Sequence, residues 1–267
     1  MTCELSVVMC TYNEVERLPR ALDEFIGTLK DHTEKVEILI IDNGSTDGTR
    51  EFLTTIKHPC VRVILNEHNL GKGGSIKKGF RLSSGQFVCI HDPDCEYDGA
   101  DVWRLYQHAQ ANSSKLVLGS RVKGGQARFH YFLNYLGVLG LSQLIRLLYG
   151  AKVSDAATAM KLLQGDYARS LQLECSGFEL DFEIVVRVAR LGGRIDEVPV
   201  EYHPRTVAQG KKIRPVQDGL RSLGTILRNR LLSAKRFWQP PVLAPPGPAA
   251  VVPPLGLPEE KVVQPEV

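Results

Sequence analysis

The residues with the clearest chemical potential are the carboxylates of Asp92-Pro93-Asp94, followed closely by Glu96. In an extended backbone, residues i and i+2 point to the same side, and Pro93 favours such a backbone because it disfavours the α region for Asp92. Two carboxylates on one side of a strand end are the hard oxygen ligands that Mg²⁺ and Mn²⁺ prefer. A solvated acidic loop has the same composition, so the position of the segment in the fold must decide between the two interpretations.

Four other polar segments follow apolar runs in the same way. They are Thr11-Tyr12-Asn13-Glu14, 42–49, 69–74 and Gly119-Ser120-Arg121. Turn formation alone explains Asn43-Gly44 and Asp47-Gly48, since these dipeptides occur in turns of any protein. Asp42 differs, because it stands at the end of the apolar run and before the turn begins.

The elements that must position these segments alternate along the chain. Apolar runs with the length and branching of buried strands lie at 5–10, 36–41, 61–65, 86–92 and 115–119. Runs with helical spacing lie at 16–29, 49–56, 74–82 and 102–111. Such an alternation predicts an α/β fold, with a mostly parallel sheet covered by helices on both faces. Ligands bind such sheets beyond the carboxyl ends of the strands, which favours the metal-site interpretation of Asp92 and Asp94.

Several other classes of protein are disfavoured. The glycine-rich segment 71–75 lacks the Gly-X4-Gly-Lys-Ser/Thr pattern of a P-loop, and no strand leads into Gly-X-Gly-X-X-Gly, so neither a P-loop ATPase nor a dinucleotide enzyme is expected. The glycines at 73 and 74 are also explained by a helix that starts close to the sheet. A net charge of +3 is too small to indicate a nucleic-acid partner.

The polar segments together resemble family 2 glycosyltransferases of the GT-A fold. The resemblance depends on Thr11-Tyr12-Asn13-Glu14, 42–49, 69–73, Asp92-Pro93-Asp94 and Gly119-Ser120-Arg121, in that order and spacing. Later segments, 177–181, 197–202, Arg205 and 210–213, resemble the dolichol-phosphate mannosyltransferase and polyprenyl-phosphate glycosyltransferase branch. The match covers about residues 4–236.

This resemblance implies a hexosyltransferase that moves a sugar, with inversion, from a nucleoside diphosphate donor to a polyprenyl or dolichyl phosphate. The donor would be of the GDP-mannose or UDP-glucose type, and the metal would be Mg²⁺ or Mn²⁺. The residues implied in donor binding are Cys10, Tyr12, Glu14, Ile40, Asp42, Lys72, Pro93, Arg205 and Lys211. Those implied in catalysis are Asp92, Asp94, Arg121 and Asp181, and those implied as metal ligands are Asp92, Asp94 and Glu96. Among them, Arg121, Arg205 and Lys211 are expected to meet phosphates.

Two alternatives to polyprenyl-phosphate transfer remain open from the sequence. The first is transfer to a saccharide hydroxyl. An acceptor phosphate is already an anion and needs no strong general base, whereas a saccharide hydroxyl needs one, and Glu179 or Asp181 is the candidate. Both acids are also explained as first-turn residues of a helix that runs to Arg190. The second alternative is a non-catalytic nucleotide-sugar adaptor. Cys10, where relatives usually have proline, and Asn43, where many have aspartate, leave the donor undetermined.

Two segments bear on a membrane surface. Residues 131–149 are apolar with Arg146 as the only formal charge, but Gly137 and Gly140 interrupt the run, so we expect a buried or interfacial helix and no span. Residues 205–236 combine leucines at helical spacing with many basic residues. A helix of this kind lies on anionic lipid or packs, solvated, on its own domain.

The C-terminus differs from the rest of the chain in composition. Prolines are concentrated in residues 239–267, which predicts a disordered tail after a glycosyltransferase domain at 1–238. The six cysteines form no Cys-X-X-Cys pair and there is no secretory signal, so we expect a cytoplasmic protein, either free or at the cytosolic face of a membrane through lipid or a membrane-protein partner.

Overall fold

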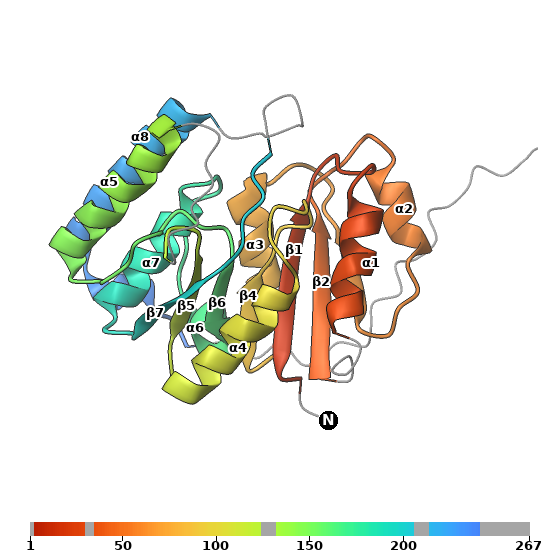
Figure 1. The fold of residues 1–267 in the computed structure, drawn as a ribbon, viewed down its shortest axis with the longest axis horizontal. Helices are drawn as coiled ribbons and strands as arrows, with labels where there is room; N and C mark the ends of the chain where they lie inside the picture. Colours follow the sequence, from red (N-terminus) through yellow and green to blue (C-terminus); the bar gives the residue numbers. More distant parts are fainter. Residues whose placement is uncertain (1–2, 30–34, 124–131, 206–213, 241–267) are drawn as a thin grey trace, which may run out of the picture.

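The computed structural model describes residues 3–29, 35–123, 132–205 and 214–240. Within them, seven strands form one sheet in the spatial order β3-β2-β1-β4-β6-β5-β7 (Figure 1). The strands are β1 (Leu5–Thr11), β2 (Val36–Asp42), β3 (Val61–Leu65), β4 (Phe87–Ile90), β5 (Leu116–Ser120), β6 (Lys161–Gln164) and β7 (Ile195–Pro199).

Strand β6 is the exception to a parallel arrangement. It is antiparallel to both of its neighbours, β4 and β5, whereas all other neighbouring strands are parallel. The carboxyl ends of the other strands therefore meet at one rim of the sheet, and β6 brings its amino-terminal end to the same rim. Lys161, the first residue of β6, pairs with Ile90 on β4 and Leu118 on β5.

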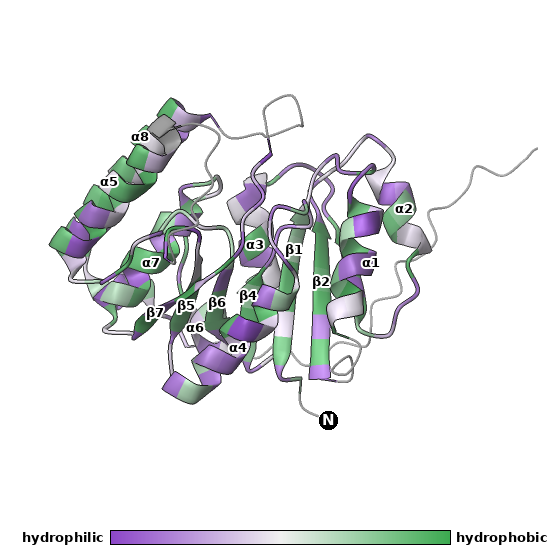
Figure 2. Cartoon of the chain, in the orientation of Figure 1, coloured by the Kyte–Doolittle hydropathy of each residue, from purple (hydrophilic) through white to green (hydrophobic). Residues whose placement is uncertain are grey.

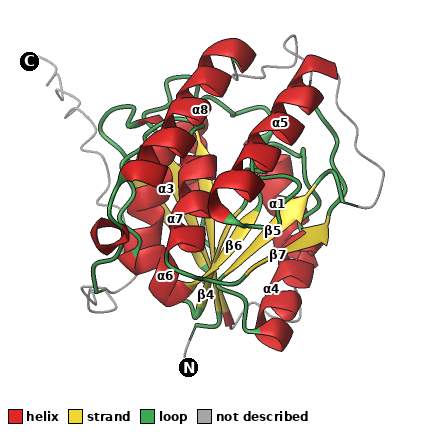
Figure 3. Cartoon of the chain, turned by 90° about the vertical axis from the view of Figure 1, so that its left-hand side faces the viewer, coloured by secondary structure: helices red, strands yellow, loops and turns green. Residues whose placement is uncertain are grey.

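Helices cover both faces of the sheet because the strands are apolar on both sides (Figures 2 and 3). One face packs against α1 (Leu18–Thr28), α2 (Thr49–Thr55) and α4 (Ala100–Asn112). The other packs against α3 (Gly71–Leu82), α6 (Gly165–Ser170), α7 (Leu180–Arg190) and residues of α5 (Phe132–Tyr149) and α8 (Pro215–Leu231). A short 3-10 helix, Ala234–Phe237, follows α8.

The predicted α/β fold with a mostly parallel sheet covered on both faces is confirmed. The predicted strands and helices up to residue 120 are all present, but β4 ends at Ile90 rather than residue 92, and α3 begins at Gly71 rather than residue 74. Strands β6 and β7 and helix α6 were not anticipated from the sequence. Residues 241–267, most of the predicted tail, lie outside the described residues.

Helices α5 and α8 pack against each other and against α7. Helix α8 buries Asp218, Ser222, Ile226 and Asn229, and Leu220, Leu227 and Leu231 face outward. The large apolar side chains that are exposed in the described residues all lie on these two helices: Leu136 and Leu147 on α5, and Val216, Leu220, Leu227 and Leu231 on α8. No helix of the described residues has the length and hydropathy that crossing a membrane requires.

Candidate active site

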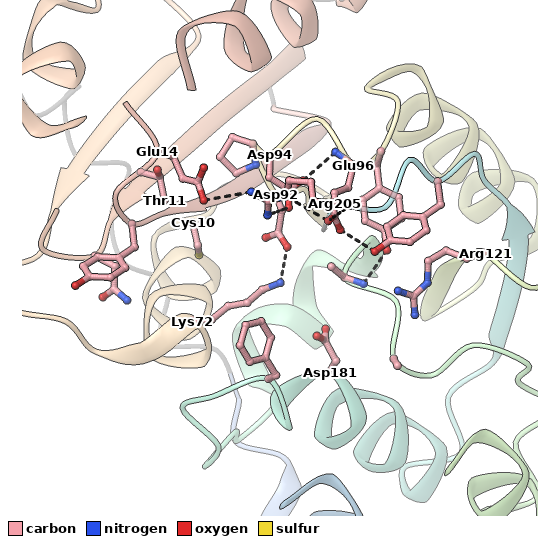
Figure 4. A pocket seen from close by; sticks show the side chains of 18 of the residues that line it. Cys10, Thr11, Glu14, Lys72, Asp92, Asp94, Glu96, Arg121, Asp181 and Arg205 are labelled. Atoms are coloured by element: carbon pink, nitrogen blue, oxygen red, sulfur yellow. Dashed lines mark hydrogen bonds and ion pairs between the residues drawn. The ribbon is translucent and has the colours of Figure 1, made fainter. Parts of the chain in front are cut away.

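A cavity of about 300 Å³ opens at the carboxyl rim of the sheet (Figure 4). Its wall comes from the segments after β1, β2, β3, β4, β5 and β7, from the segment before β6 and from the start of α7. The predicted site residues that line it are Cys10, Tyr12, Glu14, Lys72, Asp92, Pro93, Asp94, Glu96, Arg121, Asp181 and Arg205. Residues from distant parts of the chain therefore meet at the rim where the sequence places them.

Two predicted donor-binding residues do not line this cavity. The side chain of Ile40 is fully buried in the core beneath the sheet. Asp42 is also fully buried, and its carboxylate accepts hydrogen bonds from the backbone N–H groups of Gly44 and Ser45, at 3.2 and 3.3 Å. Asp42 therefore supports the loop after β2 through its hydrogen bonds. Lys211, which was also predicted to bind the donor, lies outside the described residues.

The loops after β1 and β2 are tied to each other. Asn13, which has a positive φ of 52°, donates its backbone N–H to the Ser45 hydroxyl at 2.9 Å. Its side-chain oxygen accepts the backbone N–H of Thr46 at 2.8 Å. Asparagine tolerates the left-handed region better than most residues, so the loop that carries Cys10, Tyr12 and Glu14 is held in place by an asparagine at its tightest point.

The acidic segment after β4 is paired with two long cationic side chains. The Lys72 ammonium lies 2.5 Å from Asp92, and the Arg205 guanidinium lies 2.6 Å from Asp94. Arg205 also lies 3.2 Å from Glu96 and 3.5 Å from Glu14. Figure 4 shows these side chains converging on one wall of the cavity.

Negative charge is in excess at this wall. In the described part of the cavity, five carboxylates (Glu14, Asp92, Asp94, Glu96, Asp181) face three cationic side chains (Lys72, Arg121, Arg205). Burial, and then repulsion by Asp92 and Glu96, raise the pKa of Asp94 to about 7, although Arg205 acts in the opposite direction. Burial alone would lower the pKa of Lys72, but Asp92 and Asp181 raise it above its usual range.

This donor set fits a divalent cation at Asp92 and Asp94, because a hard cation would relieve the crowding of their charges. The described residues do not gather a third ligand. Both oxygens of Glu96 are engaged, one by the Tyr202 hydroxyl at 2.8 Å and the other by Arg205. No group of three His, Cys, Asp or Glu side chains arranged to hold a metal occurs in the described residues. The assignment of Glu96 as a metal ligand therefore stays a prediction.

Arg121 lines the cavity and is held in place by Asp155, which does not line it. Its guanidinium makes two contacts of 2.8 Å with the carboxylate of Asp155, which is fully buried. The Arg121 guanidinium carbon also lies 5.1 Å from the centre of the Tyr202 ring. This bidentate pair fixes the direction of Arg121 more firmly than a single contact would.

Asp181 lies in the first turn of α7 and lines the cavity, whereas Glu179 does not. A Glu179 oxygen accepts the backbone N–H of Gly177 at 3.1 Å, so that residue serves the turn before α7. Asp181 pairs with the ammonium of Lys161 at 2.9 Å. Of the two candidate bases, only Asp181 is therefore placed to contact a substrate.

Asp155, Lys161 and Tyr202, which contact Arg121, Asp181 and Glu96, were not assigned a role from the sequence. Tyr202 lies in the segment 197–202 that resembles the polyprenyl-phosphate branch. A lysine that opens the apolar run Lys161-Leu162-Leu163 was the available signal, because lysine is almost never fully buried without a partner.

The fold and the site define a glycosyltransferase of the GT-A class. A profile described as "Glycosyl transferase family 2" matches residues 6–171. The chain belongs to glycosyl transferase family 2 and is a glycosyltransferase enzyme.

The similar proteins are consistent with the branch named from the sequence. A dolichyl-phosphate beta-glucosyltransferase of Dictyostelium discoideum is 29% identical over 252 residues, covering 88% of this chain and 76% of the relative. An undecaprenyl-phosphate mannosyltransferase of Micrococcus luteus is 30% identical over 217 residues, covering 76% and 85%. Among solved structures, glucosyl-3-phosphoglycerate synthase of Mycobacterium tuberculosis with Mn²⁺, uridine diphosphate and phosphoglyceric acid has a TM-score of 0.63 at 18% identity, covering 86% of this chain and 80% of that one.

Proposed function

We propose that the protein transfers a hexose from a nucleoside diphosphate sugar to the phosphate of a polyprenyl lipid, with inversion at the anomeric carbon. The observation that carries the proposal is the cavity wall in which Asp92 and Asp94 lie beside Lys72 and Arg205. The named activities of the two relatives above support a polyprenyl phosphate acceptor. The Mn²⁺ and uridine diphosphate in the similar solved structure support a metal-dependent nucleotide-sugar donor.

The reaction forms one bond and breaks another. An oxygen of the acceptor phosphate attacks the anomeric carbon, and the bond from that carbon to the diphosphate breaks, with its electron pair leaving on the nucleoside diphosphate. Lys72, Arg121 and Arg205 are the cationic side chains of the cavity that can stabilise the charge developing on phosphate oxygens. A divalent ion held by Asp92 and Asp94 would supply Lewis-acid stabilisation of the same charge.

The acceptor proposal is sharpened by the setting of Asp181. A phosphate acceptor requires no proton removal, and the Asp181 oxygen that lies 2.9 Å from Lys161 is already accepting a hydrogen bond. A saccharide hydroxyl acceptor is the second candidate, because Asp181 is a carboxylate in the cavity wall. The two differ in one outcome: Asp181→Asn abolishes transfer to a hydroxyl, but leaves transfer to a phosphate in place.

The outward leucines of α5 and α8 support contact with a membrane surface. Neither helix carries an exposed acidic side chain, whereas Arg146, Arg221, Arg228 and Arg230 are exposed beside the leucines. An apolar ridge flanked by arginines is complementary to anionic lipid. Peripheral attachment at the cytosolic face of a membrane would bring a lipid-linked acceptor to the enzyme.

The test is a transfer assay with a panel of nucleotide sugars and a polyprenyl phosphate, with Mg²⁺, with Mn²⁺ and with EDTA. We expect turnover with at least one donor and its loss in EDTA. Binding of nucleoside diphosphates by calorimetry, with and without metal, separates loss of binding from loss of transfer. Binding without transfer to any acceptor would favour the adaptor alternative, and failure of every donor would overturn the proposal.

A further inference from the structure

Lys161 is a fully buried lysine directly beneath the cavity. It stands at the first position of β6, between Ile90 on β4 and Leu118 on β5, so its backbone lies between two strands at the rim of the sheet. Its ammonium donates to an Asp181 oxygen at 2.9 Å and also contacts the backbone oxygen of Thr158. It does not line the cavity itself, and it therefore acts through what it contacts.

The fold alone does not account for a charge at this position. The neighbouring strand residues are aliphatic, and replacing a buried ion pair by apolar side chains is often neutral or stabilising. Burial lowers the pKa of Lys161, although Asp181 acts in the opposite direction. A lysine kept in such a place points to a requirement of the adjacent site.

Asp181, the partner of Lys161, lines the cavity together with Arg121. Asp181 and Arg121 lie on the side away from Cys10 and Thr11 (Figure 4). A phosphate that approaches this side carries negative charge and meets the negative charge of Asp181. Lys72, whose pKa Asp181 also raises, is already paired with Asp92, so an Asp181 without Lys161 would repel an anionic acceptor in a cavity that has an excess of carboxylates.

We propose that Lys161 is a positioning residue that fixes Asp181 and cancels its charge, so that this end of the cavity admits an anionic phosphate acceptor. The inference rests on the proposed polyprenyl phosphate transfer and extends it to a determinant of acceptor class. Lys161 touches no substrate. It sets the charge and direction of the side chain that does.

The experiment measures transfer to a short-chain prenyl phosphate by four variants, Lys161→Met, Lys161→Arg, Asp181→Asn and the double variant Lys161→Met/Asp181→Asn. We expect Lys161→Met to raise the KM for the prenyl phosphate roughly tenfold while the KM for the donor stays within about twofold. The double variant, which removes both charges, should recover most of the loss. Lys161→Arg should stay near wild type, and Asp181→Asn should lower the acceptor KM because it leaves an unopposed cation.

Lys115→Met is the matched control, since Lys115 precedes β5 near the opposite end of the sheet and contacts Gln164. Thermal unfolding of every variant identifies loss of folding. If Lys161→Met does not fold, Asp181→Asn alone still decides, because a raised acceptor KM would overturn the inference. Equal changes in donor and acceptor KM, or a double variant no better than the single one, would also overturn it. Absence of transfer by the wild-type protein would instead overturn the proposed function.

Discussion

The two ends of the cavity hold their charges in different ways. At the acidic end, Asp92 and Asp94 pair with Lys72 and Arg205, and all four side chains keep between 12% and 18% of their surface exposed. At the other end, Asp155 and Lys161 are fully buried partners of Arg121 and Asp181. Separating a buried pair leaves an uncompensated charge, whereas a partly exposed pair exchanges its partner for a ligand at smaller cost. We therefore expect the acidic end to rearrange around the substrate. The other end, which we call the fixed end, is expected to hold its side chains in place.

The largest effect on activity is expected at the acidic end. Asp94→Asn removes a carboxylate that fits a metal, and we expect turnover to fall by about 10³-fold, the scale of losing one preorganised electrostatic group. The measurement is the initial rate of sugar transfer at saturating donor and metal. Asp23→Asn, an exposed aspartate on α1, is the control and should behave as wild type. Turnover near wild type in Asp94→Asn would remove the acidic end from the chemistry.

The fixed end should respond in stability before it responds in activity. Asp155→Asn leaves the Arg121 guanidinium without its bidentate partner, and we expect the free energy of unfolding to fall by about 3–5 kcal/mol. Urea denaturation followed by circular dichroism measures this change. Glu24→Gln breaks the exposed pair of Arg20 and Glu24 and is the control, with no measurable change expected. Equal stability losses in both variants would contradict the distinction between the two ends.

The difference between the two ends of the cavity also explains which parts of the fold and site could be predicted from the sequence. Strands β1 and β2 have seven residues each and are mostly apolar, and Asp92 comes two residues after the apolar strand β4, so the place of the acids at the rim could be predicted. Strand β6 has four residues and nothing in it indicates its reversed direction, and β7 reads Ile-Asp-Glu-Val-Pro. The pair Lys161 and Asp181 joins β6 to α7, and the two residues are twenty positions apart in the sequence. Such a pairing depends on tertiary packing and leaves no local pattern.

Glu96 stands at the acidic end, but both of its carboxylate oxygens accept hydrogen bonds, one from Tyr202 and the other from Arg205. In this respect it resembles the buried pairs of the other end. If it anchors Arg205 rather than holding a metal, Glu96→Gln should reduce turnover roughly thirtyfold and change the affinity for Mn²⁺ by less than about threefold. Calorimetric titration with Mn²⁺, with nucleoside diphosphate present, measures the second quantity. A large loss of Mn²⁺ affinity would restore Glu96 to the ligand set predicted from the family resemblance. Glu51→Gln, on the exposed side of α2, controls for loss of a surface carboxylate.

The smallest effect is expected at the outward leucines of α5 and α8, which we propose to contact a membrane surface. Asp181 lies on α7, and α7 packs against α5 and α8, on which Leu136, Leu147, Leu220, Leu227 and Leu231 are exposed. If these leucines enter the lipid interface, Leu220→Ser should weaken binding to vesicles of anionic lipid about fivefold, since transfer of one partly exposed leucine contributes about 1 kcal/mol.

Co-sedimentation with vesicles measures the bound fraction, and transfer to a short-chain prenyl phosphate should stay at the wild-type rate, because that acceptor does not depend on a membrane. Gln107→Ser, an exposed position on α4, is the matched control. Unchanged vesicle binding in Leu220→Ser, with wild-type protein bound, would assign the attachment to another surface. Loss of soluble transfer would instead mean that α8 supports α7 and the frame around Asp181, and the outward leucines would then need a partner other than lipid.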